Sequence, residues 1–367
     1  MKSPQGLLAR MSAPRRIRTA HFCHWADGLE DAPAFLARLP ALDLSKRVTN
    51  AADPALLRMA RLDCDWHGEN TRAFAAMTHP SLEFLPAYVS GAPGLLDLLK
   101  LPPASATGEE RWLIFDGQNP QKLAGALGKL LAFLKRNGWR VLLYGFDEVS
   151  RVMPCFGELA PHLDVLIHDE SPLDERGRAL LPASCRTIHR SWVANLVPFA
   201  APFVEQPEEK IFFLGSKLGL TDNRLRQIQF LEKKFPGRVV DSHDHSVSVA
   251  DRHQVNRYKV SLCPEGRKFA VPTMSATHTD RPFWSGSLGM VPVSENSKAG
   301  DRLEALHRAG LILRYEQGDL ESLGTACERA LAMSRDERRK IYEHFNRHET
   351  VGTVVAEAIA GCLSPAP

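Results

Sequence analysis

The chain has 367 residues, of which 44% are apolar and 24% charged, and its formal net charge is +3. This composition is typical of a globular protein too long for a single core, so two domains are expected. A small net charge without a long run of Lys or Arg argues against general nucleic-acid binding. No apolar run reaches the ~20 residues that span a bilayer, so at most peripheral membrane contact is expected.

Seven cysteines are spread along the chain, and none of them forms a C-x-x-C pair. An odd and dispersed set of cysteines is typical of free thiols in a reducing compartment. The N-terminal residues are basic, but they lack the apolar segment of a secretory signal. The sequence therefore predicts a cytoplasmic protein.

Strands alternate with helices through the first half of the chain. A first strand is expected at residues 17–22, and it runs into a polar loop that holds His24 and Asp27. Further strands are expected at residues 82–89, 112–115, 140–144, 163–168 and 187–188, with a long helix at 121–137 that Gly138 closes. Such alternation predicts a mainly parallel sheet with both faces covered.

A proline-rich segment separates the two halves. Residues 198–209 read PFAAPFVEQPEE, and three prolines make this segment the best candidate for a linker between domains. The alternation then restarts with a strand at 210–214, which ends at Gly215 and Ser216. A helix at 222–235, with Leu225, Ile228 and Leu231 on one face, and a strand at 238–240 follow.

The most informative stretch runs from residue 258 to residue 296. A strand at 259–263 breaks at Pro264 into a basic loop, a polar helix start follows, and a second strand at 290–293 ends in a polar tip. Ligands of parallel sheets bind beyond the carboxyl ends of the strands, where the loop and the tip would both lie. This pattern predicts half of a nucleotide-binding α/β unit. Its candidate site residues are Glu265, Arg267, Lys268, Thr279, Asp280, Arg281, Glu295 and Asn296.

Two segments of this stretch, YKVSLCPEG and DRPFWSGSLGMVPVSE, resemble the donor-binding signature of exostosin-like glycosyltransferases and, more loosely, that of α1,3-fucosyltransferases. The resemblance implies a GT-B-like α/β fold, in which two Rossmann-type domains with mainly parallel sheets face each other across a cleft. It implies a nucleoside-diphosphate sugar of UDP or GDP type as donor in the C-terminal domain, with no cofactor. The domains would be residues 1–203 and 204–345, with a helix in 346–367 packing back on the N-terminal domain.

The chain departs from the family pattern at one place. Where the family has an acidic residue and Ala before Leu, this sequence reads Trp284–Ser285–Gly286–Ser287–Leu288. The carboxylate that would hold the donor ribose is therefore absent there. Glu295 is the nearest replacement, since an ionised acid can accept hydrogen bonds from two hydroxyls; the alternative is a solvated loop acid.

The diphosphate of the donor needs positive charge near it. Arg267 can grip phosphate oxygens with two hydrogen bonds and Lys268 adds a mobile charge, although an Arg-Lys pair is also common in a solvated turn. Thr279 and Asp280 open a helix, where free amides favour an anion but either residue could also be a simple cap. Arg281 is a candidate for a phosphate contact or a salt bridge, and Gly215 and Ser216 for a wall of the pocket.

An inverting transferase also needs a base that takes a proton from the acceptor hydroxyl. His24 and Asp27, in the loop after the first strand, are the first candidates. Asp116 and the Asp169–Glu170 pair, at other strand ends, are rivals for the same role. A retaining enzyme would need no such base.

The cluster Asp241–Ser242–His243–Asp244–His245 contains metal-binding residue types. Alternate residues of a strand end point in opposite directions, so these ligands converge poorly, and we expect no metal. The His21-x-x-His24 pair is read in the same way.

These observations favour a glycosyltransferase that moves a sugar from a nucleoside-diphosphate sugar to a hydroxyl of a glycan or glycolipid, in surface-polysaccharide assembly, without a metal. A non-catalytic GT-B-like protein that binds glycan or nucleotide is the main alternative, supported by the substituted SGSL segment. A metal-dependent hydrolase centred on the His/Asp cluster is the third.

Overall fold

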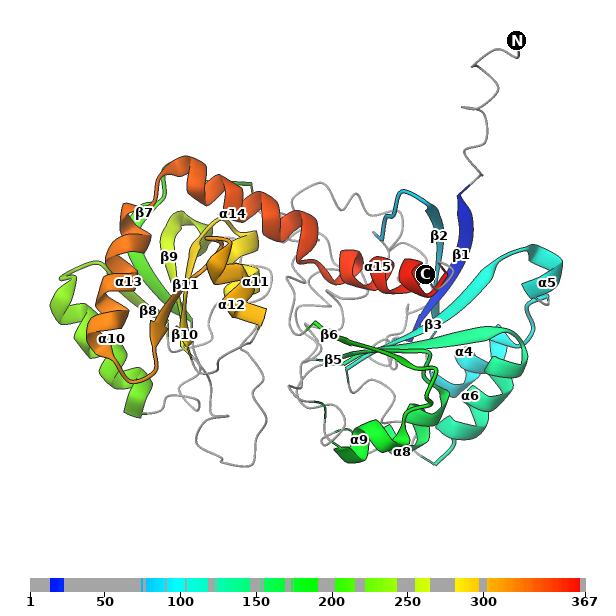
Figure 1. Ribbon diagram of the computed structural model, residues 1–367. Coiled ribbons are helices and arrows are strands. Elements are labelled where there is room, and N and C mark those ends of the chain that lie inside the picture. Colours follow the sequence, from blue (N-terminus) through cyan, green and yellow to red (C-terminus); the bar gives the residue numbers. More distant parts are fainter. Residues whose placement is uncertain are drawn as a thin grey trace, which may run out of the picture.

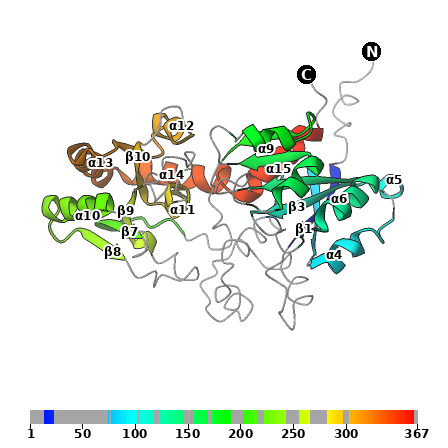
Figure 2. The ribbon, with the colours of Figure 1, turned by 90° about the horizontal axis from the view of Figure 1, so that it is seen from below.

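The computed structural model describes residues 14–22, 74, 77–89, 91–102, 104–117, 123, 125–145, 153, 155–168, 173, 175–190, 202–214, 222–242, 255–264, 281–296 and 302–363. The strands among them form two separate sheets, one in each of two lobes (Figure 1). Each sheet has its own hydrophobic cores. The last two helices run from one lobe to the other, as two perpendicular views agree (Figures 1 and 2).

The first sheet has the strand order β2-β1-β3-β4-β5-β6, and all of its pairs are parallel. The strands are β1 (Arg15–Phe22), β2 (Leu82–Val89), β3 (Glu110–Asp116), β4 (Trp139–Tyr144), β5 (Val165–His168) and β6 (Arg186–His189). The described helices of this lobe are α4 (Gly91–Leu98), α5 (Ala104–Thr107), α6 (Leu127–Arg136), α8 (Phe156–Leu159) and α9 (Glu175–Leu180). Pro86 lies in the edge strand β2, where its missing amide proton is tolerated.

Helix α6 is shorter than the sequence pattern suggested. The leucine spacing predicted a helix from residue 121, but the helix begins at Leu127. Gly125 has a φ of 87°, a left-handed conformation that interrupts the helix. The predicted end is confirmed, because Gly138 has a φ of 81° directly after the Asn137 C-cap.

The second sheet has the order β11-β10-β9-β7-β8 and is also parallel throughout. Its strands are β7 (Glu208–Leu214), β8 (Val239–Ser242), β9 (Tyr258–Cys263), β10 (Val291–Asn296) and β11 (Leu313–Glu316). Its described helices are α10 (Asp222–Lys234), α11 (Arg281–Ser287), α12 (Arg302–Arg308), α13 (Leu320–Ala332) and α14 (Arg335–His348). Ser334 and Glu337 form a capping box at the start of α14.

The two sheets share one topology. Numbered within each lobe, both begin with the order 2-1-3-4-5, which is a common order of doubly wound α/β domains. The strands before and after the proline-rich segment, β5–β6 and β7, belong to different sheets. Two Rossmann-type sheets in one chain confirm the GT-B-like fold class. The cleft expected between them and the domain boundaries stay predictions.

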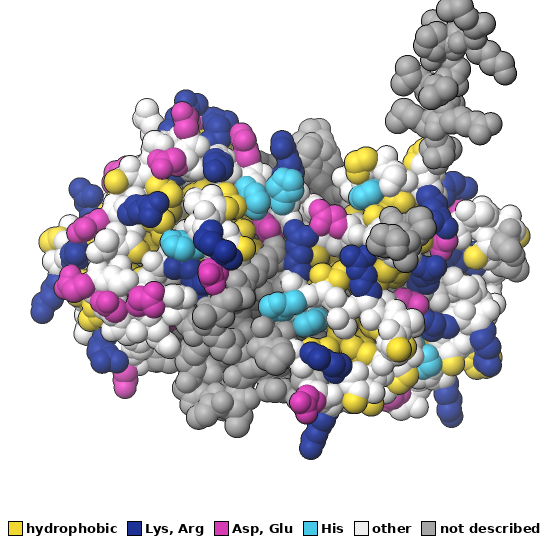
Figure 3. Space-filling view, in the orientation of Figure 1, with side chains coloured by type: hydrophobic (Ala, Val, Ile, Leu, Met, Phe, Trp, Pro, Cys, Tyr) yellow, Lys and Arg dark blue, Asp and Glu magenta, His cyan; other side chains and the backbone are white. Residues whose placement is uncertain are grey.

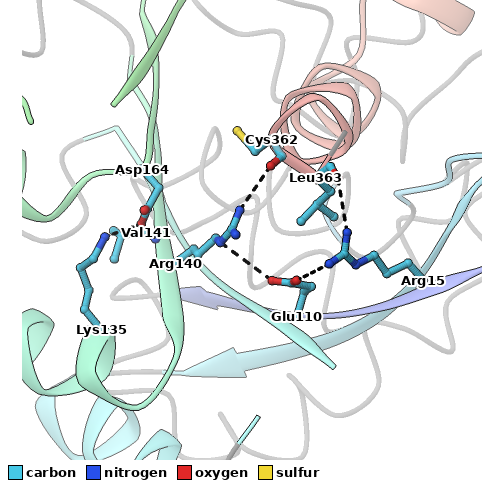
Figure 4. Close-up of polar contacts among 8 residues, drawn as sticks. All are labelled: Arg15, Glu110, Lys135, Arg140, Val141, Asp164, Cys362 and Leu363. Atoms are coloured by element: carbon cyan, nitrogen blue, oxygen red, sulfur yellow. Dashed lines mark hydrogen bonds and ion pairs between the residues drawn. The ribbon is translucent and has the colours of Figure 1, made fainter. Parts of the chain in front are cut away.

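The final helix, α15 (Val351–Leu363), follows α14 after a break at Glu349–Thr350. Its buried face belongs to the same hydrophobic cluster as Trp112, Ile114 and Val165 of the first sheet. At its carboxyl end, Arg15 and Arg140 donate hydrogen bonds to the carbonyl oxygens of Leu363 and Cys362, at 3.4 and 3.5 Å (Figure 4). Glu110 lies between the two guanidinium groups. Cations at the carboxyl end of a helix also interact favourably with the negative end of the helix dipole.

The segment before β7 is bound to α14. Arg338 is 2% exposed and donates to the carbonyl oxygens of Gly289, Val204 and Glu205, at 3.2, 2.9 and 3.0 Å. Burial lowers the pKa of this guanidinium. The guanidinium carbons of Arg338 and Arg339 both lie about 5 Å from the centre of the Phe203 ring (4.8 and 4.9 Å). This contact fixes the segment to the second lobe.

No helix in the part of the chain that the structure describes is long and apolar enough to cross a membrane. On the face shown in Figure 3, basic and acidic side chains are interspersed over both lobes. This distribution agrees with the small net charge of the whole sequence.

Candidate functional site

The second sheet has a switch point between β7 and β9. From β7 the chain goes to β8 on one side, and then crosses to β9 on the other side. In open parallel sheets, ligands bind beyond the carboxyl ends of the strands at such a point. The sequence continues from these two strand ends into Gly215 and Ser216 and into the loop with Arg267 and Lys268.

Most of the predicted donor residues lie outside the residues that the structure describes. They are Gly215, Ser216, Glu265, Arg267, Lys268, Thr279 and Asp280. Three predicted residues are described: Arg281, Glu295 and Asn296. All three lie near the carboxyl edge of the second sheet, at the start of α11 or the end of β10.

Arg281 lies across the switch point. It is the first residue of α11, and its Nη1 donates to the carbonyl oxygen of Pro264, directly after β9, at 3.3 Å. Its guanidinium carbon is 5.9 Å from the ring centre of Phe213, near the end of β7. One cation therefore contacts residues at the ends of both strands that flank the switch point.

Glu295 is buried, contrary to the expectation of a polar tip after the strand. It lies within β10 and is 1% exposed. Its Oε1 accepts hydrogen bonds from Nδ2 of Asn223 at 3.2 Å and from Nε2 of Gln227 at 3.4 Å, both on α10. The Oε1 of Gln227 accepts one from the hydroxyl of Tyr315 on β11, at 3.1 Å. We call these four residues the Glu295 network.

The Glu295 network also corrects the predicted face of α10. The apolar spacing placed Leu225 in the core, but Leu225 is 37% exposed. The buried residues of this helix are Arg224, Gln227, Ile228 and Leu231. Two polar residues therefore occupy core positions in the first half of the helix. The pairing of Gln227 with Glu295 on β10 and Tyr315 on β11 was not visible in the sequence.

Asn296 ends β10 and joins it to β11. Its Nδ2 donates to Oε1 of Glu316 at 3.0 Å, and this contact is exposed to solvent. The two residues are also register partners in the parallel pair. The structure thus shows Asn296 in a strand-to-strand contact at the carboxyl edge of the sheet.

The segment that departs from the family pattern is a packing interface. Ser285 is buried, and its hydroxyl donates to Oγ of Ser261 on β9 at 2.7 Å. A Cβ on Gly286 would lie 2.3 Å from the ring of Phe345 on α14. The small residues of α11 therefore let this helix approach a strand on one side and a helix on the other. Their presence here has a structural reason.

The first sheet has the equivalent switch point between β1 and β3. His21 is inside β1, not in the loop after it, and its ring contacts Phe74 edge to face at 4.4 Å. His21 pairs in register with Ile114, so Asp116 lies two residues further along β3 on the same face. Both His21 and Asp116 are buried. The loop with His24 and Asp27, and the Asp169–Glu170 pair, lie outside the described residues.

A histidine pair at the far end of this sheet was missed by the sequence analysis. His168 ends β5, His189 ends β6, and their rings stack at 5.5 Å. The next residue, Arg190, donates to the carbonyl oxygen of His348 and to Oε2 of Glu357, both at 2.6 Å. The carboxyl end of β6 therefore lies against the junction between α14 and α15. Two single histidines far apart in sequence gave no signal of this.

The described residues contain no group of three or more metal-binding side chains that could hold an ion. Asp241 and Ser242 lie at the end of β8, whereas His243, Asp244 and His245 are outside the described part of the chain.

Comparisons with known proteins complete the description. No protein-family model matches the chain, and no curated protein matches it in sequence. Among solved structures it is similar to Anabaena Alr3699/HepE in complex with UDP and glucose, with 10% identity and a TM-score of 0.46 over 94% of this chain and 100% of that one. It is also similar to an α,α-trehalose-phosphate synthase (UDP-forming) from Burkholderia vietnamiensis (11% identity, TM-score 0.41, 94% of this chain and 99% of that one). The glycosyltransferase SnogD from Streptomyces nogalater gives 11% identity and a TM-score of 0.35, over 95% and 99%.

Proposed function

We propose that this protein is a glycosyltransferase that transfers a sugar from a nucleoside diphosphate to a hydroxyl group. The observation that carries the proposal is the switch point between β7 and β9, where Arg281 contacts residues at both strand ends. The exostosin-like signature lies on β9, α11 and β10, around the same point. A diphosphate that leaves in the reaction gains negative charge, and fixed cations stabilise that charge in the transition state.

The finer assignments rest on the sequence. We propose that Arg267 and Lys268 hold the donor diphosphate, with Thr279, Asp280 and Gly215–Ser216 lining the pocket. The acceptor would be a glycan or glycolipid hydroxyl, which fits a role in surface-polysaccharide assembly. The proposal of this acceptor and this role rests on the exostosin-like pattern in the sequence.

We further propose that the acceptor is activated at the switch point of the first sheet. The loop with His24 and Asp27 follows β1, and Asp116 ends β3, the strand on the other side of this point. A base must lie within hydrogen-bond reach of the hydroxyl that it deprotonates. His24 and Asp27 are our first candidates and Asp116 is their rival.

The proposal is tested by a thermal-shift screen with UDP, GDP and CMP, followed by turnover assays of the corresponding sugar donors. A nucleotide at a hundred times its dissociation constant should add about 2.7 kcal/mol to the stability of the folded state. Donor turnover would support the transferase. Nucleotide binding with no turnover of any donor would favour the non-catalytic alternative.

Donor binding is expected not to need a metal ion. Arg267 and Lys268 supply the positive charge that a bound cation would otherwise provide. Addition of EDTA should therefore leave the nucleotide affinity measured by calorimetry unchanged. A loss of affinity in EDTA that manganese or magnesium restores would contradict this expectation.

A further inference from the structure

We infer that Glu295 acts as a positioning residue that fixes the start of α10 at the donor site, and that it does not hold the donor ribose itself. This inference rests on the proposed function for its catalytic meaning, but the contacts that carry it are independent of any ligand. Glu295 is near the end of β10, and its side chain accepts hydrogen bonds from Asn223 and Gln227, which are both on α10.

The placement of α10 gives these contacts their importance. Helix α10 begins at Asp222, and only residues 215–221 separate it from β7, one of the two strands at the switch point. Asn223 is in its first turn and Gln227 is one turn later. A hydrogen-bond acceptor that binds both amides holds the first two turns of the helix to the carboxyl end of β10.

Tyr315, the fourth residue of the network, orients the side chain of Gln227. Gln227 and Tyr315 are each 1% exposed, and the Tyr315 hydroxyl donates to Oε1 of Gln227 at 3.1 Å. With its oxygen engaged by Tyr315, the amide of Gln227 presents its NH₂ group to Glu295. Buried polar groups that satisfy one another in this way specify one arrangement of the elements that carry them. The network therefore joins β10, β11 and α10 below the edge where the donor would bind.

A role through hydrogen bonding differs from a role through charge. Glutamine keeps an acceptor oxygen that both amides can use, whereas alanine keeps none. A positioning role therefore predicts that Glu295→Gln keeps the amide exchange and the ligand affinity of the wild type and that Glu295→Ala does not. A carboxylate that held two ribose hydroxyls would be impaired by both substitutions.

The experiment has two parts, amide hydrogen exchange on the variants and calorimetry with two ligands. Amide exchange over residues 222–228 should be faster in Glu295→Ala by at least roughly tenfold, the factor for one lost hydrogen bond, because the substitution removes the acceptor of two. Asn223→Ala, which keeps Glu295 and the Gln227 contact, should also show faster exchange over these residues, by a smaller factor. Glu295→Gln and the control Glu316→Gln, an exposed acid on the neighbouring strand, should both match the wild type.

Calorimetry with UDP and with inorganic pyrophosphate then separates the two possible roles. If Glu295 positions the part of the site that binds the phosphates, Glu295→Ala should weaken the binding of UDP and of pyrophosphate by the same factor, roughly tenfold. A direct ribose contact predicts weaker UDP binding with unchanged pyrophosphate binding, and this result would overturn the inference. Unchanged exchange over residues 222–228 in Glu295→Ala and Asn223→Ala would also overturn it. If the wild type binds neither ligand, the proposed function fails, and the exchange data alone decide whether Glu295 fixes α10.

Discussion

Replacement of Arg338 by alanine is expected to lower the free energy of unfolding by about 3–5 kcal/mol. The side chain is 2% exposed and donates to three carbonyl oxygens. Without it, these oxygens lose their charged donor, and the Phe203 ring loses one of the two guanidinium groups that lie over it. A cavity is left between α14 and the segment before β7. Urea unfolding followed by circular dichroism measures the loss.

Arg335→Ala is the matched control for this substitution. Arg335 lies one turn earlier on α14, its side chain is 58% exposed, and it pairs with Glu205 of the same segment. Solvent screens an exposed ion pair, so its loss costs little and this variant should unfold close to the wild type. Equal stability of the two variants would contradict the role given to Arg338.

Gly286→Ala is expected to destabilise the protein by about 1–3 kcal/mol, as overpacking of a core commonly does. An added Cβ would lie 2.3 Å from Cδ2 and 2.5 Å from Cε2 of Phe345, which is fully buried. Neither helix can move away easily, because Ser285 is bonded to β9 and Phe345 belongs to the core of the second lobe. Thermal or urea unfolding checks the prediction.

Two further variants test the cause of this loss. Gly157→Ala, in α8, adds a Cβ that meets nothing within 4 Å, and it should be neutral or slightly stabilising. Phe345→Leu should recover part of the stability when it is combined with Gly286→Ala, because a smaller side chain leaves room for the new methyl group. Simple addition of the two separate losses would show that the Phe345 ring is not the obstacle.

The sequence was sufficient to predict two parallel α/β units, because strand and helix periodicities alternate and a proline-rich segment separates the halves. The order of the strands could not be predicted in this way. It depends on pairing between segments far apart in the chain, and only that order reveals the two switch points.

The features that sequence reasoning missed are buried polar groups. Periodicity assigns apolar residues to the core, so it favoured Leu225 over Gln227 on α10. The structure buries Gln227 because Glu295 and Tyr315 satisfy its amide from two other elements. For the same reason, the pattern placed Glu295 in a polar tip after the strand, as a ribose ligand or a solvated loop acid, and gave no sign of its partners on α10. Such pairings become visible only when three separate segments are brought together.

The most direct test of the central claim is a calorimetric titration of the folded protein with UDP and GDP, carried out on the wild type and on Arg267→Ala. We expect saturable binding of at least one nucleotide by the wild type. We also expect a loss of about 1.5–3 kcal/mol in the variant, the contribution of a charge-assisted hydrogen bond. Arg267→Lys should recover only part of the affinity, because an ammonium group cannot reproduce the guanidinium fork. Undiminished affinity in Arg267→Ala would contradict the phosphate-binding role, and failure of the wild type to bind either nucleotide would contradict the donor site as a whole.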